Sequence, residues 1–162
     1  MGVSSFAYKL VLLLHISSAI VGFGGVLLNG VYATRAKKRP PAEALAVVET
    51  NTWVSMKVAE IFIYLTAVFG LGLVGLSDKQ WKFSQTWIWL ALVVYIVGLG
   101  ISHGLLMPRV KKLIALMREV VGGSPTAAAD ATKLEPQIGG ISMALNLVLV
   151  VVLVLMIWKP GV

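Results

Sequence analysis

The sequence predicts an all-α integral membrane protein, a four-helix bundle with both termini outside the cytoplasm. Of its 162 residues, 58% are hydrophobic and 13% are charged, whereas about 25% are charged in an ordinary soluble domain. Four segments, at about 8–33, 58–76, 86–107 and 138–158, are apolar enough to cross a bilayer, which takes about 20 residues. A third observation, the uneven distribution of lysine and arginine, gives the orientation.

The first segment is expected to stay in the membrane rather than to be cleaved as a signal peptide. No basic run precedes it, and its apolar stretch is longer than the core of a signal peptide. A basic flank follows it at once, which is typical of a stop-transfer sequence. That flank consists of Arg35, Lys37, Lys38 and Arg39.

Ten of the 14 lysines and arginines fall in two loops, 34–57 and 108–137, which are therefore expected in the cytoplasm. The net charge of +7 is expected to attract anionic lipid head groups. The basic residues flank the membrane, so no nucleic-acid partner is expected. Four tryptophans are then predicted to form a belt at the outer interface: Trp81, Trp87, Trp89 and Trp158.

The two cytoplasmic loops are expected to be too small to form a domain of their own. Residues 42–56, after two prolines, are predicted to form an amphipathic stretch that lies on the membrane surface. Residues 109–121 are predicted to continue the third helix beyond Pro108, and 126–136 to form a flexible linker. These loops hold too little apolar surface for a soluble domain, so residues 1–162 are expected to be a single membrane domain.

One face of the first helix carries polar and small residues. His15, Ser18, Gly22, Gly25 and Asn29 are spaced 3, 4, 3 and 4 residues apart, which places them on one side of a helix. Small residues let helices approach closely in lipid, and an ionisable residue among them is a candidate functional site. We call these five residues the His15 face.

Tyr95 is the expected partner of His15. At a rise of 1.5 Å per residue, Tyr95 on the third helix lies at the depth of His15. It also belongs to a face of small residues, with Ala91, Gly98 and Ser102. We therefore expect the first and third helices to pack closely, with Tyr95 hydrogen-bonded to His15. His15 is then either a ligand or proton-handling group, or a structural, neutral imidazole bonded to Tyr95, to Ser18 or to a backbone carbonyl.

A second polar cluster is expected near the cytoplasmic side, with contributions from all four helices. A carboxylate and an imidazole at this level could handle protons or ions. The alternative is structural: Lys57 neutralises Glu60, and the asparagines join helices. The cluster consists of Asn29, Lys57, Glu60, His103, Ser142 and Asn146.

Familiar catalytic and metal-binding patterns are missing from the sequence. There is no cysteine, so thiolate ligands and disulfides are excluded. The two aspartates, Asp78 and Asp130, fall in loops on opposite sides, so they complete no Ser-His-Asp set. His15 and His103 are separated by roughly 15 Å along the bundle, too far to sandwich one haem. The sequence by itself assigns no enzymatic activity.

The first helix resembles that of a group of small four-helix bacterial membrane proteins. This group includes predicted integral membrane proteins of unknown function, the copper-resistance D-type family and the J-type protoporphyrinogen oxidases. The shared features are Lys9, Leu13-Leu14-His15, the Gly24-Gly25 pair and Arg35. The resemblance covers about a fifth of the chain and implies an antiparallel bundle, with haem or copper handled through His15 in some members.

The leading functional expectation is a small protein of the bacterial inner membrane that associates with haem b. His15 would ligate the haem iron, because imidazole is a good axial ligand, and Tyr95 would lie nearby. Ser18, Gly22 and Gly25 would leave room for the flat cofactor. One alternative is a non-enzymatic accessory subunit, with a membrane partner or a second copy. The other is a proton- or ion-translocating module that uses Glu60 and His103.

Overall fold

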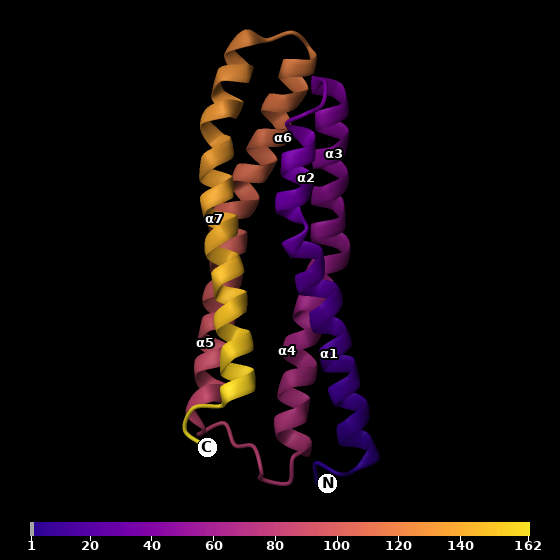
Figure 1. Ribbon diagram of the computed structural model, residues 1–162, viewed down its shortest axis with the longest axis vertical. Coiled ribbons are helices and arrows are strands. Elements are labelled where there is room, and N and C mark those ends of the chain that lie inside the picture. The colour runs from indigo at the N-terminus through magenta and orange to yellow at the C-terminus, as the bar shows by residue number, and fades with distance from the viewer. Residues whose placement is uncertain (1) are drawn as a thin grey trace.

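The computed structural model describes residues 2–162 as four long helices that run side by side (Figure 1). All regular elements within these residues are helical, and two of them, η1 and η2, are short π-helical turns. In chain order the elements are α1 (Phe6–Leu27), α2 (Asn29–Ala36), α3 (Pro41–Val54), η1 (Ser55–Ala59), α4 (Glu60–Leu76), α5 (Thr86–Ile101), η2 (Ser102–Leu106), α6 (Met107–Val121) and α7 (Pro125–Trp158).

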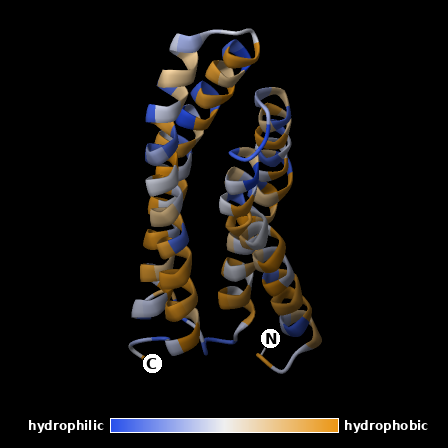
Figure 2. Cartoon of the chain, turned by 45° about the horizontal axis from the view of Figure 1, so that its top comes forward, coloured by the Kyte–Doolittle hydropathy of each residue, from blue (hydrophilic) through white to orange (hydrophobic). Residues whose placement is uncertain are grey.

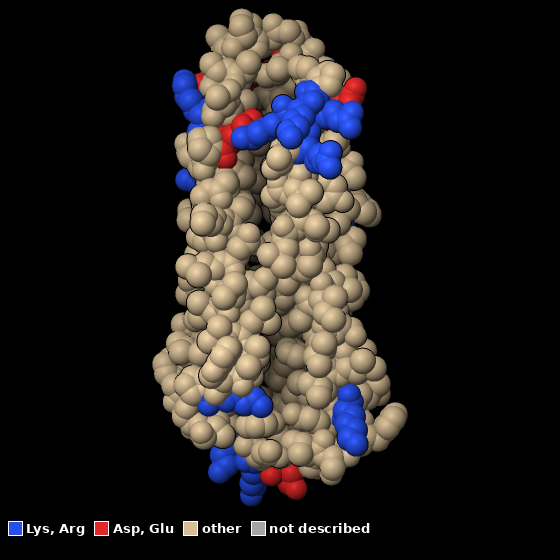
Figure 3. All heavy atoms as spheres, viewed as in Figure 1, with Lys and Arg blue, Asp and Glu red and all other residues tan. Residues whose placement is uncertain are grey.

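The four helices are long and apolar enough to span a membrane, as the sequence predicts. Counted through their kinks and π turns, they have 31, 36, 36 and 34 residues. A helix of 36 residues extends about 54 Å, whereas the hydrocarbon core of a bilayer is about 30 Å thick. Charged side chains gather at both ends of the molecule and leave an uncharged belt between them (Figure 3). Hydrophilic residues likewise gather toward the ends of the helices, and hydrophobic residues dominate between them (Figure 2).

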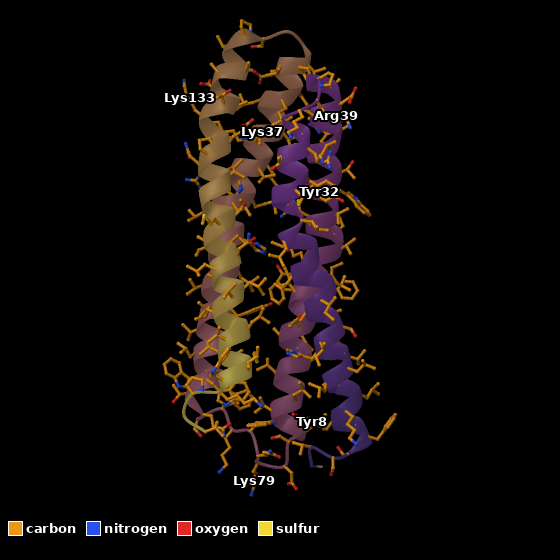
Figure 4. All side chains as sticks on the ribbon, in the orientation of Figure 1. Tyr8, Tyr32, Lys37, Arg39, Lys79 and Lys133 are labelled. Carbon is orange, nitrogen blue, oxygen red and sulfur yellow. The ribbon has the colours of Figure 1, made fainter. Side chains whose placement is uncertain are left out.

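The two ends of the bundle differ in what they carry. One end holds both chain termini (Figure 1), together with Tyr8 and Lys79 (Figure 4); we call it the terminal end. The other holds Lys37, Arg39 and Lys133 (Figure 4); we call it the basic end. The basic end is formed by α2, α3, α6 and the start of α7 (Figure 1).

Two expectations about the loops are wrong, because each segment is part of a long helix. Residues 42–56 continue through η1 into α4 and form one rod, Pro41–Leu76, instead of lying on the membrane. No glycine or proline interrupts the chain between residues 42 and 69. Residues 126–136 form the start of α7, since Ser124 caps the helix by accepting from the Ala127 amide and alanines follow. The expected extension of the third helix beyond Pro108 is confirmed as α6.

The helices are arranged as two hairpins. In the first hairpin, α1 and α2 pack on α3, η1 and α4; in the second, α5, η2 and α6 pack on α7. Two glycines of the His15 face allow the close approach in the first hairpin. A Cβ added at Gly22 would lie 2.8 Å from the backbone nitrogen of Ile63, and one at Gly25 would lie 3.0 Å from Cβ of Ala59. The expected close packing of the first and third helices is therefore wrong: α1 packs on α4.

The hairpins meet mainly through α3 and α6 near the basic end. At the terminal end, they are joined through side chains. The indole N–H of Trp81 donates to the hydroxyl of Tyr8 at 3.0 Å. Lys159, directly after α7, places its ammonium group 4.2 Å from the centre of the Trp81 ring. A cation over an indole face is attracted to it, so this contact holds the C-terminal end against the loop between α4 and α5.

Candidate functional site

The clearest polar constellation among the described residues joins the two hairpins through Tyr64. The Tyr64 hydroxyl donates to Oε1 of Glu60 at 2.8 Å, within the helix α4. The same hydroxyl lies 2.7 Å from Nε2 of His103 in η2. Nε2 of His103 is 3.4 Å from Oε1 of Glu60. We call Glu60, Tyr64 and His103 the bridging trio.

The geometry of the trio fixes the direction of its hydrogen bonds. Because Tyr64 donates its single hydroxyl hydrogen to the carboxylate, its oxygen accepts a hydrogen bond from Nε2–H of His103. The order of donation is therefore His103 to Tyr64 to Glu60. The side chain of His103 is 47% exposed and that of Glu60 is 27% exposed, so both ends of the chain of bonds reach the surface of the protein.

Both π turns lie next to this trio. In η1, the Glu60 amide bonds back to the carbonyl of Ser55; in η2, the Met107 amide bonds back to the carbonyl of Ser102. Pro108, which has no N–H, is the second residue after η2. A π turn rotates the residues around it away from their α-helical positions, and such turns are frequent at functional sites. Here the turns set the directions of Glu60 and His103.

The predicted cytoplasmic-side cluster is divided in the structure. Glu60 and His103 come together in the trio, whereas Asn29, Ser142 and Asn146 line a separate cavity between the hairpins. Asn29 also accepts a hydrogen bond from Ser55 in η1 at 3.0 Å. Lys57 is exposed and forms no ion pair with any described residue, so it does not neutralise Glu60.

His15 is held by α4 rather than by Tyr95. Its Nδ1 lies 2.8 Å from the carbonyl oxygen of Thr66, and its ring lies against Gly70. The Tyr95 hydroxyl instead donates to the carbonyl of Ile63 at 3.1 Å. The expected hydrogen bond between His15 and Tyr95 is therefore wrong, and the alternative of a bond to a backbone carbonyl is the one observed.

The residues expected to surround a haem do not fit that role. Ser18 is 3% exposed, and Gly22 and Gly25 lie directly against Ile63 and Ala59. This part of the His15 face is a helix–helix contact and leaves no space for a flat cofactor. No group of three His, Cys, Asp or Glu side chains placed to hold a metal ion occurs in residues 2–162. Ligation of haem iron by His15 alone stays a prediction.

Comparison with known proteins gives a family but no activity. A family model described as predicted integral membrane protein (DUF2269) matches residues 9–160. The chain belongs to this family. No curated protein and no solved structure matches it. The match to the DUF2269 family spans all four long helices, and therefore includes both the bridging trio and His15.

For this DUF2269 protein, the sequence analysis missed Tyr64, the central member of the trio. Tyrosine is common in apolar helices, so Tyr64 alone gives no polar signal. The available signal was its spacing: Tyr64 follows Glu60 by four residues, which places the two side chains on the same face of a helix. Ser55, which donates to Asn29, was also missed, because this bond joins two different helices and no spacing within one helix indicates it.

Proposed function

We propose that the protein is a proton-handling module of the bacterial inner membrane, with the bridging trio as its relay near the cytoplasmic side. The observation that carries this proposal is the Tyr64 hydroxyl, which bonds to both Glu60 and His103, at 2.8 and 2.7 Å. A hydroxyl that accepts from one titratable group and donates to another can pass a proton between them. Ionisable groups within membrane helices commonly mark such paths.

The relay begins with a proton taken up at Nδ1 of His103, which is half-exposed. The imidazolium then gives its Nε2 proton to the oxygen of Tyr64, while the hydroxyl hydrogen of Tyr64 passes to the carboxylate of Glu60. The products are a neutral histidine with its hydrogen on Nδ1, an unchanged tyrosine and a protonated glutamic acid. Because His103 and Glu60 belong to different hairpins, a change in hairpin spacing would open or close the relay.

Proton flux into liposomes tests the proposal. The purified protein is reconstituted with a trapped pH-sensitive dye, and a potassium gradient with valinomycin supplies the driving force. We expect Glu60→Gln to abolish the protein-dependent flux, and Tyr64→Phe to lower it by about tenfold or more, because a positioned proton donor commonly contributes 100-fold or more. Glu119→Gln is the matched control, since Glu119 forms no hydrogen bond or ion pair through its side chain with any described residue.

The Glu119→Gln control shows whether the loss of any one carboxylate charge changes the flux, or only the loss of the carboxylate in the trio. Equal flux in the wild type, Glu60→Gln and Glu119→Gln would refute a role for the trio. A wild-type protein without flux that co-purifies with a membrane partner would favour the accessory-subunit alternative.

A second candidate function, haem association, rests on His15. A hydrogen bond from Nδ1–H to the Thr66 carbonyl leaves the lone pair of Nε2 free, which is the arrangement that suits a metal-ligating histidine. The sequence resemblance of the first helix to the copper-resistance D-type and J-type protoporphyrinogen oxidase group implies that His15 handles haem or copper, as in some members of that group. A bound haem would supply one-electron chemistry. Absorption spectra of the protein purified from haem-supplemented cells test this candidate function. We expect a stoichiometric Soret band in the wild type that is lost in His15→Ala. A folded but colourless wild-type protein would exclude haem association.

A further inference from the structure

A cavity of about 500 Å³ lies between the two hairpins at the basic end. Residues of α2, α3, α6 and α7 line it, and it reaches Ser55 of η1 and Leu106 of η2. Figure 3 shows the surface hollowed between the hairpins at this end. No member of the bridging trio lines the cavity, so what it binds is independent of the proposed relay.

The cavity contains polar side chains that the protein leaves without partners. Asn51, Ser142 and Asn146 line it, and none of their side chains forms a hydrogen bond with a described residue. Asn29 uses its carbonyl oxygen for Ser55, while its amide hydrogens make no bond to any described residue. All four side chains are half-buried, so their free donors and acceptors are open to the cavity and can bond to water or to a ligand.

The rest of the lining is apolar or electrically balanced. Val48 on α3, with Val110, Leu113 and Met117 on α6, provides an apolar wall. The charged residues of the lining are Lys37 and Glu135, whose side chains form an ion pair at 2.9 Å. Since each neutralises the other, the cavity offers no net charge to a ligand.

We propose that this cavity binds an uncharged amphiphile from the membrane leaflet, with a hydrogen-bonding head on an apolar body. The asparagine amides and the Ser142 hydroxyl would bind the head, because they both donate and accept hydrogen bonds. The apolar wall on α3 and α6 would bind the body. The volume lies within the usual range for small-molecule sites, about 300–1,000 Å³. The ligand would enter through the hollow between the hairpins (Figure 3).

Binding to the full-length protein in lipid nanodiscs tests the proposal. Four probes with the same ten-carbon chain are compared by native mass spectrometry: monodecanoyl glycerol, decylubiquinone, decyl sulfate and decyltrimethylammonium. We expect saturable binding of an uncharged probe and no saturable binding of either charged one. The two uncharged arms distinguish a glycerolipid from a quinone as the source of the head group. Saturable binding of a charged probe overturns the proposal. Saturable binding of none of the four probes also overturns it, and would indicate that water fills the cavity.

Two neighbouring glycines of α7 provide matched variants. Gly139 lines the cavity and Gly140 does not, and a Cβ added at either would meet nothing within 4 Å. Both Gly139→Leu and Gly140→Leu are therefore expected to fold. We expect Gly139→Leu to weaken binding of the uncharged probe by about tenfold or more, by filling the site, and Gly140→Leu to change it less than twofold.

A second variant tests the role of the amide. Asn146→Leu keeps a similar side-chain size but removes a hydrogen-bonding group, so we expect about a tenfold loss, the value of one good hydrogen bond. Equal binding by Gly139→Leu and Gly140→Leu would place the ligand elsewhere and overturn the proposal. Unchanged binding in Asn146→Leu would overturn the assigned head-group contact.

Discussion

Replacing Gly22 by alanine tests the close packing of α1 on α4. The added methyl group would lie 2.8 Å from the backbone nitrogen of Ile63 and 3.1 Å from the carbonyl carbon of Phe62. Both are backbone atoms of a continuous helix, so they cannot turn aside as a flexible side chain could. The two helices must therefore move apart. Gly24→Ala is the matched control, because a Cβ at Gly24 would meet nothing within 4 Å.

Two opposing free-energy changes determine the size of the effect. Alanine is favoured over glycine within a helix by about 1 kcal/mol, and this gain applies at both positions. An extra methyl group in a well-packed contact costs about 1–3 kcal/mol. We therefore expect Gly24→Ala to raise the free energy of unfolding by up to about 1 kcal/mol. Gly22→Ala should be less stable than Gly24→Ala by about 1–3 kcal/mol, because the helix gain cancels in the comparison.

Unfolding of the two purified variants with increasing mole fraction of sodium dodecyl sulfate in mixed micelles measures this difference. Helix content by circular dichroism reports secondary structure, and tryptophan fluorescence reports the packing. If both alanine variants were equally stable, α1 would not approach α4 through Gly22, and the arrangement of the first hairpin would be refuted.

The remaining predictions concern contacts outside the bridging trio. Trp81→Phe removes the hydrogen bond to Tyr8 and weakens the contact with Lys159, so we expect the free energy of unfolding to fall by about 1–2 kcal/mol in the same titration. Glu49→Gln breaks the ion pair with Arg118, at 2.7 Å, but both side chains are well exposed; we expect a loss below about 1 kcal/mol that disappears in 1 M salt. A larger, salt-independent loss would contradict this reasoning.

The fold could be predicted from the sequence because the signal for each span is local. A bilayer requires about 20 apolar residues, and four segments meet that requirement without reference to their neighbours. The pairing of the helices could not be predicted in the same way. The His15 face shows that α1 packs closely on some helix, but Tyr95 on α5 and Thr66 on α4 were both available at a suitable depth, and α4 is the partner observed.

The candidate site could be predicted only in part. Glu60 and His103 are conspicuous because ionisable residues are rare in apolar helices. Tyr64 is not, and the two π turns that direct the trio have no recognisable sequence signature. The continuation of α3 into α4 was missed because the apolar spacing of residues 42–56 also suits a helix on a membrane surface. The lack of any breaking residue before Gly70 was the stronger signal.

The arrangement in two hairpins also has a consequence for biogenesis. Each hairpin pairs helices that are adjacent in the chain, so its contacts close short loops and cost little chain entropy. The first hairpin can therefore assemble in the bilayer before the ribosome has completed α7. Tyr64 and His103 belong to different hairpins, and their contact forms only when the two units meet. A chain that ends before η2 would thus carry the packed first hairpin but no bridging trio.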